Sequence, residues 1–481
     1  MKRKFFTNIS LLLVLNIIIK AFWVLGIDRS VQNMVGADDY GFYFSLFSFS
    51  VLFTILLDFG ITNYNNRSIS GNPSLLTGMI ANIFLIRLGF AILYLIVSLI
   101  IAGIIGYSGR QMSLLYILMI NQFLASFILY LRSNITALQL FRTDSFLSVT
   151  DRFIMIIICS LLLWGGLTER SFRIEWFVWC QTAGYGITFL ISLALVLSRG
   201  AVRSINFSPK QILGILKGSA PFALLALFMS VYWRIDTVML ERILPDGTVQ
   251  SGIYAQSFRL LDAAAMIPYL FAIILLPMYS KMISGQETIS DLVRFSAILM
   301  IIPAIVSTLV SVAYPYEIMD LLYVGHVDES SALLAILMCG YIPVSLVYLF
   351  STLLTALGKL KIMNFIAAGG MFLNIFLNFI LIPNWLAKGS ALATVITQGV
   401  ICILFIFFAV RSARIRIDPI FIYQIISYII IMFGLTVGLR GIDVPELVSV
   451  LIIGFAGLLF PFVLRLIKYP DLVSMIYPNS K

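Results

Sequence analysis

The stretch Gly41-Phe-Tyr43-Phe-Ser-Leu-Phe47 opens one long apolar segment, and Gly252-Ile-Tyr254-Ala-Gln-Ser-Phe258 opens another in the second half of the chain. A second pair of stretches follows in the same order and at nearly the same offset: residues 136–142 (TALQLFR) and residues 355–361 (TALGKLK). Two matches in register predict a duplicated unit of roughly 200 residues, since duplicated membrane halves around a central site are typical of secondary transporters.

The composition indicates a protein whose solvent is lipid. Of the 481 residues, 61% are hydrophobic and 11% are charged, and the mean hydropathy is +1.04, whereas a soluble domain carries about 25% charged residues. Apolar runs of about 20 residues match a hydrocarbon core of ~30 Å as helices. We count fourteen: roughly 9–26, 41–59, 83–106, 114–137, 146–167, 175–198, 219–240, 252–279, 293–314, 332–356, 362–383, 389–410, 420–438 and 446–466.

The predicted fold is therefore an all-α polytopic membrane protein with about 14 transmembrane helices. The duplicated unit predicts two halves, residues 1–205 and 206–410, and residues 411–481 follow them. We read the N-terminal apolar run as a retained first span, not a signal peptide. Between the bundles, Ser208-Pro209 resembles a helix start, and we predict a short surface helix or a plain linker there.

Basic residues predict the orientation. Most of the 32 Lys and Arg residues lie on the side of the predicted spans that carries Lys2-Arg3-Lys4. The positive-inside rule then places both termini in the cytoplasm. The net charge of +10 is attributed to topology, and nucleic acid is not an expected partner.

The sequence offers no catalytic or metal-binding pattern. It contains no phosphate-binding G-x-x-x-x-G-K-[ST] loop, and we find no paired carboxylates or Ser/His/Asp arrangement that would indicate an enzyme. The single histidine, His326, falls in a predicted outer loop, and the four cysteines fall within apolar spans as expected for buried small side chains. No metal and no cofactor are predicted, and coupling to H⁺ or Na⁺ stays open.

Charged residues inside the spans are the candidate site. Each costs about 2.5–3.5 kcal/mol at the bilayer centre on insertion scales, so each should face a cavity or a partner. Basic residues outnumber acidic ones there, which favours an anionic guest, and the arginine fork suits phosphate. The predicted cationic cavity comprises Lys20, Arg132, Arg234, Arg259 and Arg152, with Asp236, Asp262 and Asp151 as coupling groups or charge partners. Arg259 and Asp262 could also simply satisfy each other. For Arg87 an interfacial anchor is favoured, and for Asn374 and Asn378 a hydrogen bond between helices.

Four motifs resemble those of Wzx-type oligosaccharide flippases, in the superfamily that also holds MATE exporters and lipid II flippases. They are Val35-Gly36-Ala37-x-x-Tyr40-Gly41-x-Tyr43, Asp58-Phe59-Gly60-Ile61-x-x-Tyr64-Asn65-x-Arg67, Arg234-x-Asp236-x-x-Met239-Leu240, and Asn378 to Pro383 followed by Gly389-Ser-Ala-Leu-Ala-Thr394. Ser390-Ala391 replaces the family's usual Ala-Ala. From the second motif we expect Asp58, Asn65 and Arg67 to form a cytoplasmic gate.

The resemblance implies two pseudo-symmetric six-helix bundles, residues 1–205 and 206–410, followed in residues 411–481 by two additional transmembrane helices and a cytoplasmic tail. It also implies movement of an undecaprenyl-diphosphate-linked oligosaccharide from the inner to the outer leaflet of a bacterial inner membrane by alternating access. The product would serve O-antigen (lipopolysaccharide), capsule or exopolysaccharide synthesis, with polymerase and chain-length proteins as pathway partners. Three alternatives remain. A MATE-type multidrug exporter would need buried carboxylates without excess arginine, a membrane-bound glycan polymerase or ligase would need a large outer loop, and a lipid II flippase would share the diphosphate chemistry.

Overall fold

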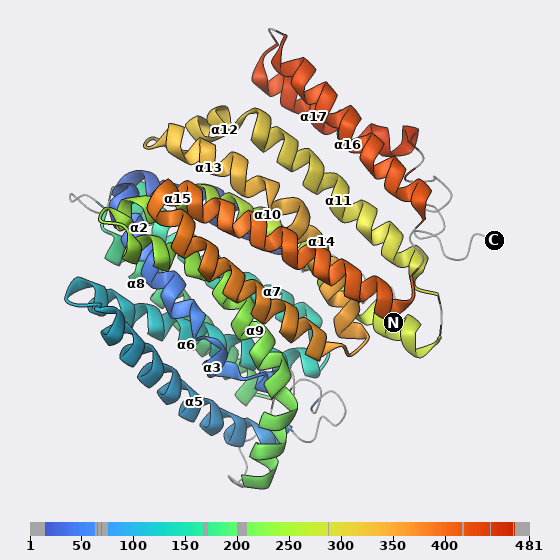
Figure 1. Cartoon of the computed structure of the whole chain (residues 1–481). Coiled ribbons are helices and arrows are strands. Elements are labelled where there is room, and N and C mark those ends of the chain that lie inside the picture. Colours follow the sequence, from blue (N-terminus) through green and yellow to red (C-terminus); the bar gives the residue numbers. More distant parts are fainter. Residues whose placement is uncertain are drawn as a thin grey trace. The chain divides into compact units, whose positions relative to one another are not determined.

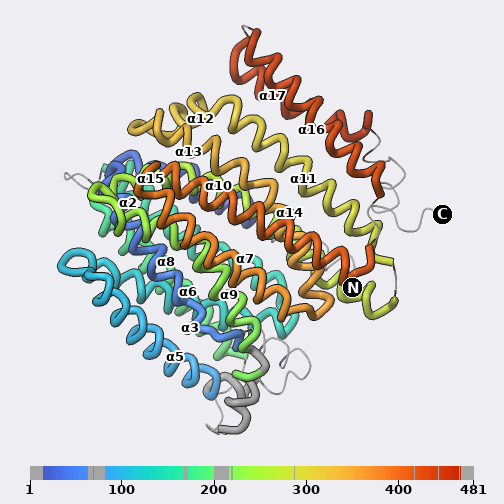
Figure 2. Tube along the Cα trace, in the orientation of Figure 1, coloured from blue at the N-terminus to red at the C-terminus, as the bar shows by residue number. Residues whose placement is uncertain are grey.

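The structure is a computed structural model that describes residues 15–62, 65, 69, 76–166, 172–199, 209–286, 288–415, 418–442, 444–464 and 466. These residues form helices joined by short turns, and the described part contains no strand (Figure 1; Figure 2). The predicted all-α class is confirmed.

Eleven of the described helices are long and apolar enough to cross a membrane. α15 (Leu360–Ala413) contains two of the predicted spans, because the backbone breaks at Leu386 (φ 52°). The first two predicted spans are divided among the helical residues 15–22, the π-helix η1 (Trp23–Asp28), α2 (Arg29–Leu52) and α3 (Ile55–Asp58). Each predicted apolar run is thus mainly helical where it is described, with interruptions at residues 53–54 and at residue 340.

The first compact unit comprises residues 1–255 and includes α5 (Leu76–Ile105), α6 (Arg110–Ala137), α7 (Phe141–Trp164), α8 (Ile174–Leu197) and α9 (Pro209–Ile243). α6 packs on α8 and on α2, and α9 packs on α2. The unit ends inside α10 (Gly247–Ser284), so it extends beyond the predicted boundary at residue 205. The helix predicted to begin at Pro209 does begin there, but it continues without interruption into the seventh span instead of forming a separate surface helix.

The second compact unit comprises residues 256–481 and contains most of α10, then α11 (Ser290–Ala313), α12 (Pro315–Leu322), α13 (Val327–Cys339) and α14 (Tyr341–Ala356). α15 packs on α13 and α14. The last two helices, α16 (Pro419–Arg440) and α17 (Glu446–Val463), pack on each other and on α11. Tyr428 of α16 donates a hydrogen bond to the carbonyl of Gly457 on α17 (3.0 Å), which ties this pair together.

The two halves of the first repeated motif meet each other. A Cβ atom on Gly41 would overlap the carbonyl oxygen of Thr248, and a Cβ on Gly252 would overlap the carbonyl oxygen of Ala37. Nearby, Thr248 donates its hydroxyl to the carboxylate of Asp38. The two glycines are therefore required because backbone touches backbone where α2 crosses the start of α10.

The second repeated motif forms two matching helix ends. α6 ends with Gln139 in the left-handed region (φ 60°), and α14 ends with Gly358 there (φ 68°). The amide of Leu140 donates to the carbonyl of Ile135 (3.1 Å), and the amide of Lys359 donates to that of Leu354 (2.9 Å). Both are Schellman-type terminations, so the repeated sequence encodes the same local structure twice.

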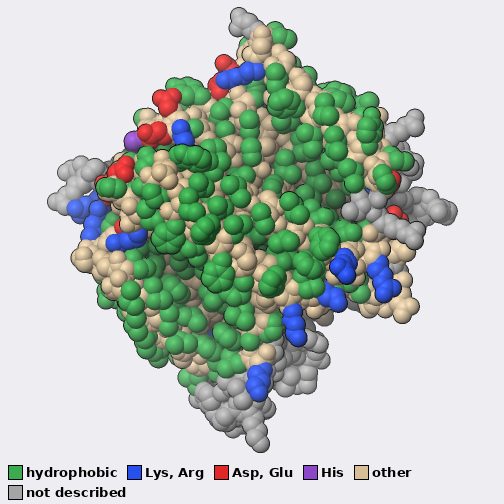
Figure 3. Space-filling view, viewed as in Figure 1, with side chains coloured by type: hydrophobic (Ala, Val, Ile, Leu, Met, Phe, Trp, Pro, Cys, Tyr) green, Lys and Arg blue, Asp and Glu red, His purple; other side chains and the backbone are tan. Residues whose placement is uncertain are grey.

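Apolar side chains cover most of the visible face, and the charged ones gather toward its margins (Figure 3). Large side chains such as Phe365 (78% exposed) and Leu447 (73% exposed) would be costly in water. Lipid contact explains their exposure.

Candidate functional site

The second span ends in an irregular stretch of backbone within the first unit. α3 ends at Asp58, and the next residues, Phe59 (φ 45°) and Gly60 (φ 81°), both adopt the left-handed conformation. Left-handed residues end a helix, so Asp58 is the last helical residue before the chain changes direction.

Asp58 is held by a buried arginine. Arg87 of α5 donates from Nη1 to Oδ1 of Asp58 (2.5 Å) and to the hydroxyl of Thr62 (2.8 Å). The hydroxyl and the backbone amide of Thr62 also donate to that same Oδ1 atom. Asp58 is thus fixed through one carboxylate oxygen.

The second terminal nitrogen of the Arg87 guanidinium is also hydrogen-bonded. Its Nη2 donates to the carbonyl (2.9 Å) and the hydroxyl (2.5 Å) of Ser126 on α6. The guanidinium lies over the rings of Phe127 and Tyr130, 5.2 Å from each centroid. Arg87 is 0% exposed and lies eleven residues, or about 16 Å, from the start of α5. The interfacial anchor expected for Arg87 is therefore wrong. Its partners, Asp58 and Ser126, lie on two other helices, which the sequence could not reveal.

A cavity of about 400 Å³ opens beside this ion pair. Its polar wall comes from span two (Thr54, Asp58, Thr62), α6 (Gln122, Ser126) and α9 (Ser230), and its apolar wall includes Val51, Ile55, Ala125, Leu129 and Ala226. The side chain of Asp58 is 28% exposed, and Asp58 lines the cavity. The volume lies within the range of about 300–1,000 Å³ that small-molecule pockets occupy.

The remaining residues of the expected gate behave differently from one another. Asn65 is buried and donates to the Ser133 hydroxyl and the Asn134 side-chain oxygen of α6, at 3.0 Å each. It therefore fastens span two to α6. Arg67 lies outside the described residues.

A second group of charges surrounds Lys20. Lys20 lies within electrostatic range of Arg152, Asp151 and Arg132. Arg132 pairs with Asp144 of α7 (2.7 Å), a partner that helical spacing within one span could not reveal. Among these five described residues three are cations and two are carboxylates, so the group is formally cationic.

Arg152 is the aromatic-bound member of that cluster. Its guanidinium lies 5.1 Å from the ring centroid of Trp23 and donates to the hydroxyl of Tyr185 (3.1 Å). Arg152 lies eleven residues after the start of α7, and its side chain is partly buried. Trp23 and Tyr185 hold the guanidinium in one place, which prepares it to bind an anion.

The seventh span contributes one cation and one carboxylate. Arg234 lies over the ring of Phe47 (5.9 Å), and Asp236 accepts a hydrogen bond from the hydroxyl of Tyr254 (2.8 Å). Arg234 and Asp236 belong to unit 1, whereas Arg259 and Asp262 are partly buried residues of unit 2. Their membership of one cavity stays a prediction.

Buried carboxylate and amide groups elsewhere have structural partners. Asp28, which the sequence did not single out, is 0% exposed and accepts from the hydroxyl of Tyr40 (2.9 Å). In unit 2, the amide of Asn378 donates to the carbonyl of Asn374 (3.0 Å), and its oxygen accepts from Ser390 (2.7 Å) beyond the break in α15. The expected hydrogen bond between helical segments is confirmed there.

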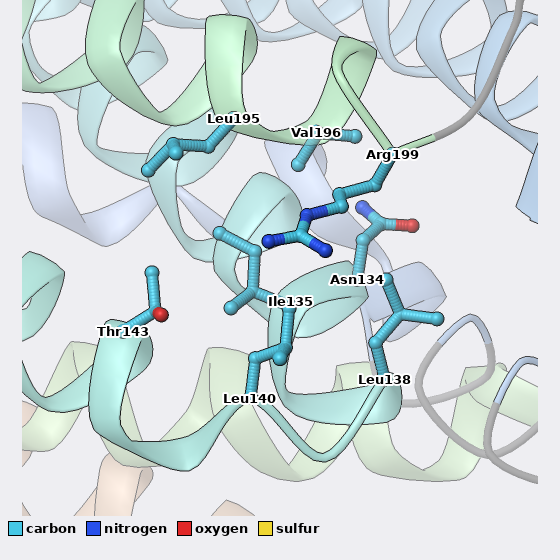
Figure 4. A pocket seen from close by; sticks show the side chains of 8 residues that line it. All are labelled: Asn134, Ile135, Leu138, Leu140, Thr143, Leu195, Val196 and Arg199. Carbon is cyan, nitrogen blue, oxygen red and sulfur yellow. The ribbon is translucent and has the colours of Figure 1, made fainter.

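A smaller cavity of about 40 Å³ lies where α6 and α8 end and α7 begins. Figure 4 shows the guanidinium of Arg199 extending over it toward Ile135 and Asn134. Apolar side chains form most of its wall, so it offers few polar contacts.

The described residues contain no group of His, Cys, Asp and Glu suited to a metal ion. Three cysteines are buried as expected, but Cys339, the last residue of α13, is exposed.

Comparison with known proteins agrees with this fold. A family model described as polysaccharide biosynthesis protein matches residues 6–283, more than half of the chain. No curated protein matches the sequence significantly.

Solved structures of membrane transporters are similar in fold. The lipid II flippase MurJ in an inward closed conformation is 16% identical with a TM-score of 0.67, and the match covers 95% of this chain and 99% of that chain. The Vibrio cholerae MATE transporter VcmN in the bent form is 14% identical (TM-score 0.58; 86% and 97% covered). A MOP superfamily transporter from Pyrococcus furiosus, whose structure is described as having a binding pocket of reverse polarity, is 12% identical (TM-score 0.58; 85% and 94% covered).

Proposed function

Since the chain belongs to the polysaccharide biosynthesis protein family, we propose that it is a flippase for an undecaprenyl-diphosphate-linked oligosaccharide. It would take the lipid-linked glycan from the cytoplasmic leaflet of a bacterial inner membrane and release it in the outer leaflet. Both termini would be cytoplasmic, and a polymerase and a chain-length protein would use the product for a surface polysaccharide.

One observation carries the proposal: Lys20 lies within electrostatic range of Arg132 and Arg152 in unit 1, beside the carboxylates of Asp144 and Asp151. A diphosphate is the anionic group of the proposed substrate, and charge-assisted hydrogen bonds from arginine to phosphate are about twice as strong as neutral ones. Arg152, fixed by Trp23 and Tyr185, is the residue we expect to bind it. Arg234 and Arg259 would extend the positive field.

The proposal is tested in a strain that lacks the gene. Its membrane lipids should contain undecaprenyl-diphosphate oligosaccharide trapped on the cytoplasmic leaflet, and the gene should clear that lipid and restore surface polysaccharide. If no such lipid accumulates and sensitivity to cationic dyes rises instead, the protein is a drug exporter and the proposal fails. Accumulation of lipid II would identify the peptidoglycan precursor as substrate.

Neutralising the fixed cation should block transport without unfolding the protein. We expect Arg152→Gln to lower the rate of export at least tenfold, because a hydrogen bond to a charged group is worth about 1.5–3 kcal/mol and 1.4 kcal/mol is tenfold. Lys281→Gln, which removes an exposed cation at the end of α10, is the matched control. Membrane insertion of both variants is measured by immunoblot. Equal export by Arg152→Gln and Lys281→Gln would contradict the role of the cationic cluster.

A further inference from the structure

The cavity beside Asp58 contains a preorganised acceptor that the described residues leave unused. Every hydrogen bond that Asp58 accepts within the described part of the chain goes to Oδ1. Because Asp58 is partly exposed and lines the cavity, Oδ2 remains available to a guest. The carboxylate cannot turn away, since Arg87 and Thr62 hold its other oxygen.

The rest of the wall also offers neutral polar groups. Gln122 uses its amide nitrogen on the hydroxyl of Ser50 (3.2 Å), which leaves its oxygen as an acceptor. Ser230 lines the cavity from α9, and its hydroxyl makes no hydrogen bond to the described residues. Ionised carboxylate, amide oxygen and hydroxyl groups beside aliphatic side chains form a surface that suits a ring bearing several hydroxyl groups.

The charge balance argues against other guests. The guanidinium of Arg87 lies 2.5 Å from Asp58 and already neutralises it, so a metal cation would meet a paired carboxylate and a like charge. A phosphate would meet the second oxygen of the Asp58 carboxylate, while both terminal nitrogens of Arg87 already donate to Asp58, Thr62 and Ser126. A neutral polyhydroxylated guest would be repelled neither by Arg87 nor by the Asp58 carboxylate.

We propose that this cavity, bounded by the second span, α6 and α9, is a subsite for one sugar residue of the transported glycan, with Asp58 Oδ2 accepting from a sugar hydroxyl. The assignment rests on the proposed function. It separates recognition of the glycan at Asp58 from recognition of the diphosphate at the Lys20–Arg132–Arg152 cluster.

The test compares two lipid probes on the full-length protein in nanodiscs. One is undecaprenyl diphosphate, and the other is the undecaprenyl-diphosphate oligosaccharide extracted from the strain that lacks the gene. Ala226→Leu fills the cavity without removing a polar group, and Leu224→Phe, which adds bulk to a side chain 48% exposed on the same helix, is its control. Asp58→Asn removes the charge, and its fold is checked by thermal unfolding.

We expect Ala226→Leu to bind the glycan-bearing lipid at least tenfold more weakly than the parent, and to bind undecaprenyl diphosphate with unchanged affinity. A well-folded Asp58→Asn should behave in the same way, because loss of a charge-assisted hydrogen bond is worth about tenfold or more. Leu224→Phe should bind both lipids like the parent.

Three outcomes would overturn the subsite. The first is that Ala226→Leu binds the glycan-bearing lipid as tightly as the parent does. The second is that Ala226→Leu loses affinity equally for both lipids. The third is that NaCl stabilises the parent more than KCl does and that Asp58→Asn abolishes this difference, which would identify a cation site. A parent protein that binds neither lipid would instead refute the proposed function.

Discussion

Arg87→Met should destabilise the protein more than loss of any exposed arginine. The substitution preserves much of the volume but removes the counterion of the Asp58 carboxylate, with which Arg87 forms a salt bridge at 2.5 Å. Removing one partner of a buried pair costs about 3–5 kcal/mol. The melting temperature of the detergent-solubilised protein should fall markedly, and glycan export should fall with it.

Arg110→Met is the matched control, because Arg110 makes two ion pairs, with Asp39 and Glu175 at 2.8 Å each, but is 51% exposed. Exposed pairs contribute about 0–1 kcal/mol. The double variant Asp58→Asn/Arg87→Met should recover part of the lost stability, since the unpaired charge is gone. If Arg110→Met is as harmful as Arg87→Met, or if the double variant is no better than the single one, burial does not set the importance of this pair.

The apolar spans could be predicted because each is a local pattern. A run such as 83–106 needs only its own composition to become a helix in lipid, and α5 covers it. The repeated glycine motif was equally visible in the sequence. The structural role of that motif could not be predicted, because no local pattern indicates that Gly41 and Gly252 contact each other's helices.

The site was harder to predict for the same reason. Helical spacing finds partners three or four residues apart, whereas Arg87 pairs with Asp58 on another helix and Arg132 pairs with Asp144 across a turn. Family resemblance directed attention to Asp58, but as part of a cytoplasmic gate. Its place beside a cavity follows from the left-handed pair Phe59-Gly60, which no hydropathy pattern reports. Arg87 was given the wrong role, and Gln122 and Ser230 were missed, because their contacts exist only in the folded structure.

Gly41→Ala and Gly252→Ala should both loosen the crossing of α2 and α10, although alanine is the better helix former. In an exposed helix interior, replacing glycine by alanine stabilises by about 0.8–1 kcal/mol. Gly103→Ala on α5 should show that gain, because its new methyl group meets nothing within 4 Å. At Gly41 and Gly252 the methyl group would overlap backbone carbonyl oxygens, which cannot rotate away as a side chain could. The sign of the effect should therefore reverse, with a cost of about 1–3 kcal/mol or more.

Cross-linking can test whether α2 and the start of α10 move apart in these variants. Asp38 and Thr248, which share a hydrogen bond at the crossing, are replaced by cysteines in a protein whose four native cysteines are alanine. The parent pair should form a disulfide readily under mild oxidation, and Gly41→Ala or Gly252→Ala should reduce its yield, while Gly103→Ala leaves the yield unchanged. An undiminished yield with raised melting temperature would mean that the helices do not meet at these glycines. A reduced yield would tie the repeated motif to helix packing, and export measured in the same variants would then report whether transport needs this contact.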